Sequence, residues 1–331
     1  MGFRIALDVM GGDFAPYKII EGALLAKEEF GGVLDLVLVG EKTIIEKYLK
    51  KLGRKFTFSI EDAPQIIKMD DPPAVSVKNK RQSSIVRGVE LVKKGEVQGF
   101  VSAGNTGAVV AASTIFLGLL PGIHRPGIAL VIPTLKGRSL LIDVGANIDP
   151  KPIHLLQYAI MGEAYYRLIL GKKNVRVGLL NIGEEASKGT ELMRESYKLL
   201  SSLNLNFLGN VEAKDIFSGK CDVIVCDGFV GNVALKVSEG FAEVASRFLK
   251  QIFKKDYLSR IGFLFIKRAL KNFSQMIDYA EYGGAPLLGV GGVVIICHGR
   301  SDERAIKNAI RVSLKEVERK LNQIIVETIN A

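Results

Sequence analysis

Short apolar runs in this chain repeatedly end in a polar residue and a glycine turn, after which a helical pattern begins. The clearest example is VIVCDGFVGNVALK, residues 223–236, where a strand-like run leads into Asp227, Gly228, Gly231 and Asn232. Backbone N–H groups are free where a helix begins, so such a turn is suited to binding an anion. Because strand and helix patterns alternate in this way from the N-terminus, the sequence predicts a parallel sheet with right-handed crossovers.

The order of the predicted elements is that of an α/β protein. Strands are expected at residues 3–9, 34–40, 55–60, 97–102, 174–181, 205–209, 223–226 and 293–297, with an antiparallel pair at 128–133 and 138–143. Helices are expected at residues 16–27, 42–52, 77–94, 109–116, 150–170, 190–203, 212–217, 233–253 and 302–329. No clean linker and no repeat of fixed period divides the chain. We therefore expect residues 1–331 to form one compact α/β unit, either undivided or in two lobes.

The charge of the chain narrows the class of partner. Its formal net charge is +10, and such a basic balance indicates an acidic partner, either nucleic acid, an anionic membrane, a phosphorylated substrate or an acidic protein. The chain has no long Lys/Arg tail and no recognisable nucleic-acid motif, so we expect no nucleic-acid partner.

The cysteines and the N-terminal sequence indicate the cellular compartment in which the protein is expected. The chain has three cysteines, Cys221, Cys226 and Cys297, so they cannot all be paired in disulfides within it. Their apolar flanks, as in VIVCD and VIICH, favour buried free thiols in a reducing compartment over a disulfide or a metal site. The N-terminus has no secretory organisation, and no apolar run is long enough to span a bilayer. These features predict a cytoplasmic protein without a bound metal.

Polar residues and glycines follow five of the predicted strands. The turns combine Asp8 with Gly11, Gly12 and Asp13, Ser102 with Gly104, Asn105 and Thr106, Asp143 with Gly145 and Asn147, Asn181 with Gly183 and Glu184, and Asp227 with Gly231 and Asn232. Each turn alone is ordinary turn chemistry. In an open parallel sheet, however, the carboxyl ends of the strands gather at one edge, where ligands bind. We therefore expect the turns to converge on one phosphate-using site.

Six segments in consistent order support a more specific interpretation. They are LDVMGGDFAP (7–16), SAGNTGA (102–108), DVGAN (143–147), LLNIGEEASKG (179–189), CDGFVGNVALK (226–236) and YGGAPLLG (282–289). With them the chain resembles the phosphate acyltransferase family of bacterial phospholipid synthesis, from near residue 3 to about residue 320.

The resemblance implies an activity, a fold and partners. Members of the family transfer a fatty acyl group from acyl carrier protein to inorganic phosphate, and a membrane acyltransferase then uses the acyl phosphate to acylate glycerol 3-phosphate. The implied fold is an α/β/α sandwich with a mostly parallel sheet and a small helical protrusion, similar to isocitrate and isopropylmalate dehydrogenases. The family forms homodimers without a cofactor and associates peripherally with the inner face of the cell membrane.

The residues can be assigned against that reaction. Phosphate must be held in line with a thioester carbonyl, and the tetrahedral oxyanion must be stabilised; no activated Ser or Cys is needed. We expect Lys188 to supply positive charge and Asn232 a hydrogen bond, with backbone N–H groups at 104–106 and 228–232 cradling phosphate. A cation is disfavoured near a helix N-terminus, which favours a functional Lys188 over a merely solvated one. Further expected phosphate or substrate contacts are Gly11, Gly12, Asp13, Gly104, Asn105, Thr106, Asn147, Glu184, Asp227 and Gly231.

Other polar residues allow simpler interpretations. The carboxylates of Asp13, Asp143 and Asp227 suit helix capping or orientation of lysines as well as substrate contact. His298 follows a strand and is a candidate acid for the leaving thiol, although a thiolate hardly needs one. His124 and His154 lie beside prolines and are expected to be structural. The segment 282–286 is either an acyl-tunnel loop or an ordinary turn.

The segment 254–273, KKDYLSRIGFLFIKRALKNF, is basic and apolar together. A helical hairpin lying on an anionic membrane fits this composition, as does docking of acidic acyl carrier protein. Packing in the core or against a second subunit is the alternative. The expected contact residues are Leu258, Ile261, Phe263, Leu264, Phe265, Lys267 and Arg268.

Two other functions remain open. An NAD-dependent dehydrogenase on the same fold would use Gly289-Val290-Gly291-Gly292 as its dinucleotide loop, but this sequence precedes a predicted strand and the GxGxxG pattern is incomplete. A non-enzymatic scaffold for lipid synthesis would use the segment 254–273 for binding alone.

Overall fold

The computed structural model describes the chain except residues 1, 54–55, 255–262, 264–265, 267–281 and 331. The strands are β1 (Phe3–Asp8), β2 (Leu34–Gly40), β3 (Ser59–Asp62), β4 (Gly99–Ser102), β5 (Gly127–Thr134), β6 (Gly137–Ile142), β7 (Arg176–Leu180), β8 (Asn206–Val211), β9 (Val223–Val225), β10 (Ala285–Leu288) and β11 (Val293–Ile296). They form one sheet in the order β3-β2-β1-β4-β11-β10-β5-β6-β9-β7-β8.

The helices are mostly connections between these strands. They are α1 (Tyr17–Phe30), α2 (Lys42–Lys51), α3 (Pro73–Asn79), α4 (Ser84–Lys93), α5 (Thr106–Ala112), α6 (Pro152–Tyr165), α7 (Glu191–Ser201), α8 (Gly228–Lys254), α10 (Glu303–Glu318) and α11 (Leu321–Ile329). Single π-helical turns, η1 (Ser113–Leu117) and η2 (Tyr166–Leu170), continue α5 and α6, and a 3-10 turn η3 (Ala213–Asp215) follows β8.

The direction of the strands reverses near the middle of the sheet. Strands β3, β2, β1, β4 and β11 are parallel to one another, but β10 is antiparallel to both β11 and β5. The predicted antiparallel pair β5–β6 is confirmed, and β6, β9, β7 and β8 are again parallel to one another. The two parallel halves of the sheet therefore run in opposite directions.

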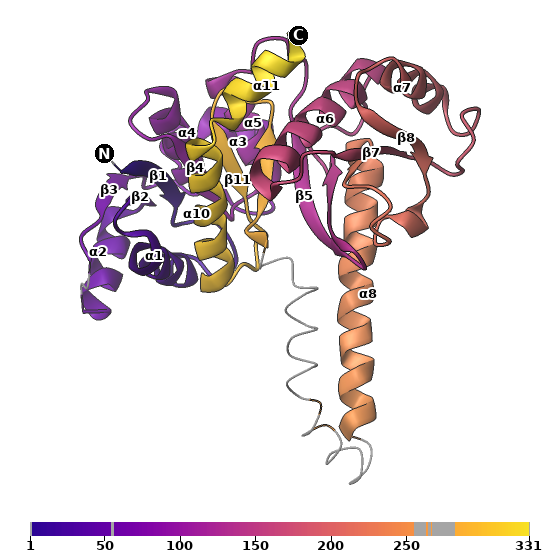
Figure 1. The fold of residues 1–331 in the computed structure, drawn as a ribbon. Coiled ribbons are helices and arrows are strands. Elements are labelled where there is room, and N and C mark those ends of the chain that lie inside the picture. The colour runs from indigo at the N-terminus through magenta and orange to yellow at the C-terminus, as the bar shows by residue number, and fades with distance from the viewer. Residues whose placement is uncertain (1, 54–55, 255–262, 264–265, 267–281, 331) are drawn as a thin grey trace.

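Helices cover both faces of the sheet, which confirms the predicted three-layer α/β/α sandwich (Figure 1). On one face, apolar side chains of α3, α4, α5 and α8 pack on alternate strand residues such as Phe100 and Leu141. On the other face, α1, α2 and α10 cover the first half of the sheet, whereas α6, α7 and α11 cover the second half. Alternation of side chains along each strand supplies both layers of the core.

The helix predicted at 77–94 is two helices. The chain leaves α3 after Asn79, and the Ser83 side chain then caps α4 by accepting the Val86 N–H. Between them, the Gln82 N–H donates to the side chain of Gln65, 2.9 Å away. The single-helix prediction was wrong because this tertiary contact and a serine N-cap compete with continued helix.

The C-terminal region also differs from the prediction. The helix expected at 302–329 is divided into α10 and α11 at Lys320, which adopts a left-handed conformation with φ 52°. Strand β10 was missed because the sequence there was interpreted as loop; Pro286 lies in antiparallel register with Ile295. Strand β3 begins at Ser59, later than the predicted residue 55.

Helix α8 is long, and much of its apolar surface is exposed. Its first turns pack on the sheet through Ala234 and Leu235, and its C-terminal part extends beyond the sheet (Figure 1). Val237 is 66% exposed and Phe241 is 75% exposed. Exposed apolar residues also continue along the helix at Val244, Phe248, Leu249 and Ile252. A stripe of this kind marks an interaction surface more often than a solvated helix face.

Candidate functional site

The polar turns lie at two edges of the sheet and not at one. Asp8 and Ser102 end β1 and β4, whereas Asp143, Asn181 and Asp227 follow β6, β7 and β9, which run in the opposite direction. The expectation of five turns at one edge was wrong, because three successive antiparallel pairings, β11–β10, β10–β5 and β5–β6, reverse the strand direction between the two halves of the sheet. We refer to the turns after β6, β7 and β9 as the second edge and to those after β1 and β4 as the first edge.

Helix α8 connects the two edges. It begins beside the Asp143 turn at the second edge, and it lies on the same face of the sheet as α5, which begins at the first edge. Farther along α8, the charges of Glu239 and Lys236 act on His298, which follows β11 at the first edge. Burial is the main cause that lowers the pKa of His298, and these neighbouring charges modify it.

The Asp143 carboxylate organises the turn that follows β6. It accepts hydrogen bonds from the backbone N–H groups of Ile128, Gly145, Ala146 and Asn147, at 2.7–3.1 Å. Burial raises the pKa of Asp143, although these N–H groups favour its charged form. The carboxylate therefore occupies the position in which the turn would otherwise hold an anion.

The backbone N–H groups at the start of α8 also donate to acceptors within the protein. The Gly228 N–H donates to the carbonyl of Asn147 at 2.9 Å, and the Val230 N–H donates to the Asp227 side chain at 2.9 Å. The Gly231 N–H donates to the carbonyl of Asp227, also at 2.9 Å. The interpretation of Asp227 as a helix cap fits this geometry. The prediction that the backbone at 228–232 cradles phosphate was wrong for these three N–H groups, because the protein itself accepts their hydrogen bonds.

Asn232 lies where α8 meets the Asp143 turn. A Cβ atom at Gly231 would come 1.9 Å from the Asp143 carbonyl oxygen, so only glycine allows this approach of helix and turn. A Cβ atom at Gly145 would lie 3.7 Å from the Cβ of Asn232. The Asn232 side chain is exposed and has no hydrogen-bond partner among the described residues. Its amide is thus free to donate beside the turn.

Lys188 is held in the turn after β7. The Asn181 side chain donates to the Lys188 carbonyl at 3.1 Å, and the Lys188 N–H donates to the carbonyl of Glu185 at 3.0 Å. Its exposed ammonium group pairs with no residue in the described part of the chain. Lys188 contacts residues of the turn after β7, and Asn232 lies beside the Asp143 turn. Among the described residues, no hydrogen bond or ion pair joins Lys188 to Asn232.

An open hollow of about 470 Å³ lies beside the Lys188 turn. It is lined by Ala186, Ser187, Glu191, Arg194, Glu195, Tyr197 and Lys198. The hollow is open and most of its lining side chains are charged or polar, whereas an acyl-chain tunnel is expected to be enclosed and apolar. Glu184, predicted to contact substrate, forms an exposed ion pair with Lys220 at 2.6 Å.

At the first edge, the glycine turns pack against each other. A Cβ atom at Gly11 would lie 2.6 Å from the backbone nitrogen of Gly104, and the Gly104 N–H donates to Ser102. Gly12 has φ +98°, and the Asp13 N–H donates to the carbonyl of Gly299 at 2.7 Å. Close packing of backbone on backbone therefore accounts for the glycines here.

The Asn105 side chain is used within the protein. Its oxygen caps α5 by accepting the Ala108 N–H, and its nitrogen donates to the carbonyls of Lys68, Met69 and Asp71 at 3.0–3.2 Å. This residue therefore fixes the 68–71 loop. Thr106 is exposed at the first position of α5.

Side chains of α6 complete the second edge, and sequence reasoning missed two of them. Tyr158 donates its hydroxyl to the carbonyl of Pro126 at 3.1 Å, and the amide nitrogen of Gln157 donates to the carbonyl of Gly122 at 2.8 Å. His154 is buried and accepts the Lys151 N–H through Nδ1, in agreement with its predicted structural role. Polar residues in this otherwise apolar helix were the signal in the sequence.

The structure offers no cysteine nucleophile. Cys221, Cys226 and Cys297 are buried and free, as predicted. Burial raises the pKa of Cys297 to about 12 and that of Cys221 to about 11, and it raises the pKa of Cys226 well above its usual value. None of these thiols ionises appreciably near neutral pH.

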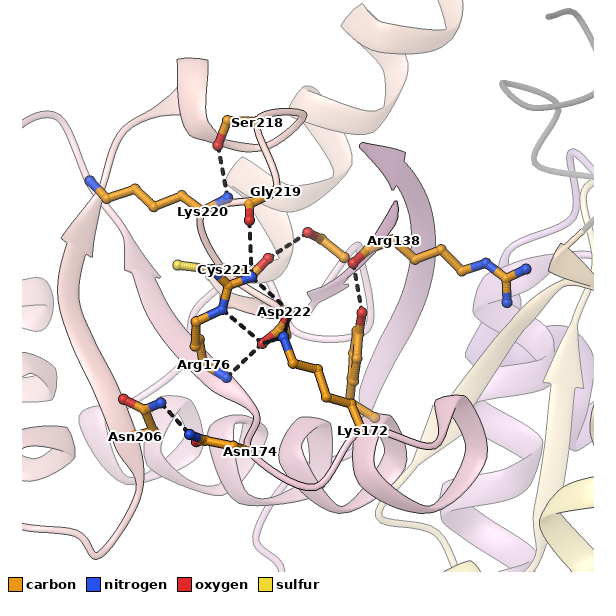
Figure 2. A network of polar contacts seen from close by, with 12 residues as sticks. Arg138, Lys172, Asn174, Arg176, Asn206, Ser218, Gly219, Lys220, Cys221 and Asp222 are labelled. Atoms are coloured by element: carbon orange, nitrogen blue, oxygen red, sulfur yellow. Dashed lines mark hydrogen bonds and ion pairs between the residues drawn. The ribbon is translucent and has the colours of Figure 1, made fainter. Parts of the chain in front are cut away.

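A separate network of charges lies at the amino ends of β6, β7 and β9 (Figure 2). Lys172 and Arg176 pair with the buried carboxylate of Asp222 at 2.8–3.0 Å. Although burial opposes ionisation, these hydrogen bonds hold the pKa of Asp222 below its usual value. The ion pairs stabilise the strand ends on the side away from the second-edge turns.

Most of the predicted membrane or carrier-protein contacts lie outside the described residues. This applies to Leu258, Ile261, Leu264, Phe265, Lys267 and Arg268. The ring of Phe263 is described, with its centroid 5.3 Å from that of Phe253 on α8. Among the helices that the structure describes, none has the length and hydrophobicity needed to cross a bilayer.

The glycines at 289–292 do not form a dinucleotide loop. They lie in the turn between the antiparallel strands β10 and β11, and the Gly289 carbonyl accepts the Leu120 N–H at 3.0 Å. No helix follows this turn before β11, so its backbone is not arranged to receive a pyrophosphate at a helix N-terminus. The geometry therefore disfavours the dehydrogenase alternative.

Comparisons with known proteins agree with this architecture. A model of the family described as "Fatty acid synthesis protein" matches residues 3–324. The phosphate acyltransferase of Pelotomaculum thermopropionicum is 48% identical over 318 residues, covering 96% of this chain and 92% of that protein. The phosphate acyltransferase of Desulforudis audaxviator is 50% identical over 310 residues, covering 94% of this chain and 91% of that protein.

Solved structures share the fold at low sequence identity. A phosphotransacetylase from Streptococcus pyogenes superposes with a TM-score of 0.66 at 19% identity, covering 96% of this chain and 94% of its own. A 4-hydroxythreonine-4-phosphate dehydrogenase from Klebsiella pneumoniae superposes with a TM-score of 0.54 at 14% identity, covering 96% and 98%. The chain thus shares its fold with a phosphotransacetylase and with a dehydrogenase, and a dehydrogenase-like fold was expected from the sequence.

Proposed function

This chain belongs to the phosphate acyltransferase family, and from that premise we propose that it transfers a fatty acyl group from acyl carrier protein to inorganic phosphate. The near full-length identity to phosphate acyltransferases carries this proposal. The product is an acyl phosphate, which a membrane acyltransferase uses to acylate glycerol 3-phosphate. No cofactor takes part in the proposed reaction.

The proposed reaction is a direct attack of phosphate on the thioester. A phosphate oxygen forms a bond to the carbonyl carbon, a tetrahedral oxyanion develops, and the carbon–sulfur bond breaks to release the carrier thiolate, which takes up a proton from solvent. Asn232 donates a hydrogen bond and Lys188 supplies positive charge where negative charge develops. The high pKa values of the buried thiols support direct attack over a cysteinyl intermediate.

Substrate contacts are proposed at both edges of the sheet. At the second edge, Asn147 belongs to the Asp143 turn, beside which Asn232 lies, and Glu184 belongs to the same turn as Lys188. At the first edge, Asp13 and Thr106 are exposed beside the glycine turns. Because α8 extends from one edge toward the other, a single acyl donor lying along it would approach both groups.

The acyl donor and the membrane are the proposed macromolecular partners. The net charge of +10 favours acidic acyl carrier protein and the anionic inner face of the cell membrane. We propose that the segment 254–273 makes these contacts from the cytoplasmic side, where the acyl phosphate is passed to the membrane acyltransferase. The enzyme is thus peripheral and not embedded.

A homodimer is the proposed assembly. The exposed apolar stripe of α8, which includes Val237, Phe241 and Phe248, supports pairing with a second copy. Pairing would remove these side chains from water without using the residues of the glycine turns.

The proposal is tested by measuring acyl phosphate formed from palmitoyl–acyl carrier protein and phosphate. We expect Lys188→Ala and Asn232→Ala to lower kcat/KM by roughly 100-fold or more, as loss of one oxyanion donor does elsewhere. Lys136→Ala is the matched control, because Lys136 is an exposed lysine near the Asp222 network. Absence of product from the native protein with every acyl chain length would favour the scaffold alternative.

A further inference from the structure

Most backbone N–H groups of the Asp143 turn and of the start of α8 are used within the protein. Three N–H groups of the Asp143 turn donate to the Asp143 carboxylate, and those of Gly228, Val230 and Gly231 also have protein acceptors. A dianion in this region therefore depends on cationic and amide side chains. We propose that Arg125 is the residue that binds the phosphate substrate here, an inference that rests on the proposed function.

The backbone of Arg125 is anchored on both sides by α6. The preceding N–H, of His124, donates to the Gln157 side chain at 2.9 Å, and the following carbonyl, of Pro126, accepts the Tyr158 hydroxyl at 3.1 Å. The Gln157 amide also donates to the Gly122 carbonyl at 2.8 Å. The loop that carries Arg125 is consequently fixed by side chains from a buried helix, which limits the entropy lost when the arginine binds a ligand.

The same contacts tie this loop to the Asp143 turn. The Asn147 side chain donates to the Tyr158 hydroxyl at 3.4 Å, and the Ile128 N–H donates to the Asp143 carboxylate at 2.9 Å. Asn147 in turn accepts the Gly228 N–H at the start of α8. A continuous chain of contacts thus leads from the residues flanking Arg125 to the helix that carries Asn232.

The side chain of Arg125 is suited to a doubly charged ligand. Arg125 is exposed, and its guanidinium pairs with no carboxylate among the described residues. Its charge acts on His154, which is hydrogen-bonded within the same cluster. A guanidinium offers two parallel N–H donors to a phosphate, whereas the ammonium of Lys188 offers a point charge. The two cations would therefore have different tasks: Arg125 holds the nucleophile, and Lys188 stabilises the oxyanion.

Steady-state kinetics of acyl phosphate formation test this assignment. We expect Arg125→Ala to raise the KM for inorganic phosphate roughly 10- to 100-fold, the range expected for losing a charged hydrogen-bond pair, while the KM for the acyl donor changes less than about twofold. Arg125→Lys keeps the positive charge but removes the two parallel N–H donors of the guanidinium, so we expect an intermediate rise in the KM for inorganic phosphate. Arg319→Ala, at an exposed arginine that follows α10, is the matched control and should change neither KM.

Direct binding supplies a readout that does not depend on turnover. Calorimetry with inorganic phosphate should show binding to the native protein and to Arg319→Ala, and a loss of affinity of the same size as the KM change in Arg125→Ala. If native protein forms acyl phosphate and folded Arg125→Ala and Arg125→Lys bind phosphate with unchanged affinity, the assignment of Arg125 is wrong and the proposed function stands. If native protein neither binds phosphate nor forms acyl phosphate, both are wrong.

Discussion

At the scale of single residues, the carboxylates of Asp143 and Asp227 accept hydrogen bonds from backbone N–H groups at the strand ends, where the sequence predicted bound phosphate. Asp143 accepts three backbone N–H groups of its own glycine turn and one from Ile128 of β5, and Asp227 caps α8 by accepting the Val230 N–H. The sequence allowed capping as one interpretation of these residues. The sequence alone did not distinguish helix capping from substrate contact, because the distinction depends on which backbone N–H groups point toward the aspartate carboxylates in the folded chain.

Asp143 should therefore matter for stability. We expect Asp143→Asn to lower the free energy of unfolding by about 3 kcal/mol, since an amide replaces part of a buried acceptor surrounded by N–H donors. Denaturant unfolding measures the change. Asp35→Asn is the control, because Asp35 forms an exposed ion pair with Arg4 and should change the free energy by less than about 1 kcal/mol. Equal effects in the two variants would contradict the structural role given to Asp143.

Buried His154 should make stability depend on pH. Burial, together with the charge of Arg125, lowers the pKa of His154 below its usual 6.5, so the folded protein binds fewer protons at this site than the unfolded chain. Its contribution to stability is complete above about pH 6.5 and is lost as the pH falls below that value. Unfolding at about pH 7.5 and 5.5 should show a smaller difference in His154→Gln than in native protein. An identical difference would show that His154 does not contribute.

At the scale of elements, strand and helix positions were largely predictable, but their interruptions were not. Apolar alternation and glycine turns located β1, β2 and the β5–β6 pair within a residue or two. The break between α3 and α4 depends on a contact between Gln65 and Gln82, far apart in sequence. Strand β10 is short and follows two glycines in left-handed conformations, Gly283 and Gly284, so its sequence resembles a loop.

Two glycines of α8 should respond oppositely to alanine. Gly231 touches the Asp143 backbone, so Gly231→Ala should lower the free energy of unfolding by about 3 kcal/mol or displace the helix start. Gly240 lies in the same helix with nothing within 4 Å of an added Cβ, so Gly240→Ala should raise it by about 0.5–1 kcal/mol. Thermal and denaturant unfolding of both variants measure the changes. Destabilisation by Gly240→Ala would indicate that α8 is packed on that side.

At the scale of the whole molecule, the reversal of the sheet decides where the polar turns lie. The sequence predicted an α/β/α sandwich correctly, yet the positions of the turns required the direction of every strand. Three successive antiparallel pairings, β11–β10, β10–β5 and β5–β6, place the turns after β1 and β4 opposite those after β6 and β9. Local sequence patterns do not contain this information, because strand direction is set by pairing between distant segments.

The exposed stripe of α8 gives a prediction for the assembly. We expect native protein to sediment as a dimer and Phe241→Glu to sediment as a monomer, because Phe241 is 75% exposed at the middle of the stripe. Glu243→Gln, at an exposed residue paired with Arg247 on the same helix, is the control and should remain a dimer. A native monomer at micromolar concentration would contradict the proposed homodimer.

Direct attack of phosphate on the thioester is tested most directly by isotope exchange. Native protein would be mixed with acyl carrier protein carrying palmitate and with labelled free carrier protein, with and without inorganic phosphate. We predict that label does not enter the acylated carrier without phosphate, and that acyl phosphate forms as soon as phosphate is added. Label exchange in the absence of phosphate would reveal a covalent acyl-enzyme and would contradict the proposed mechanism.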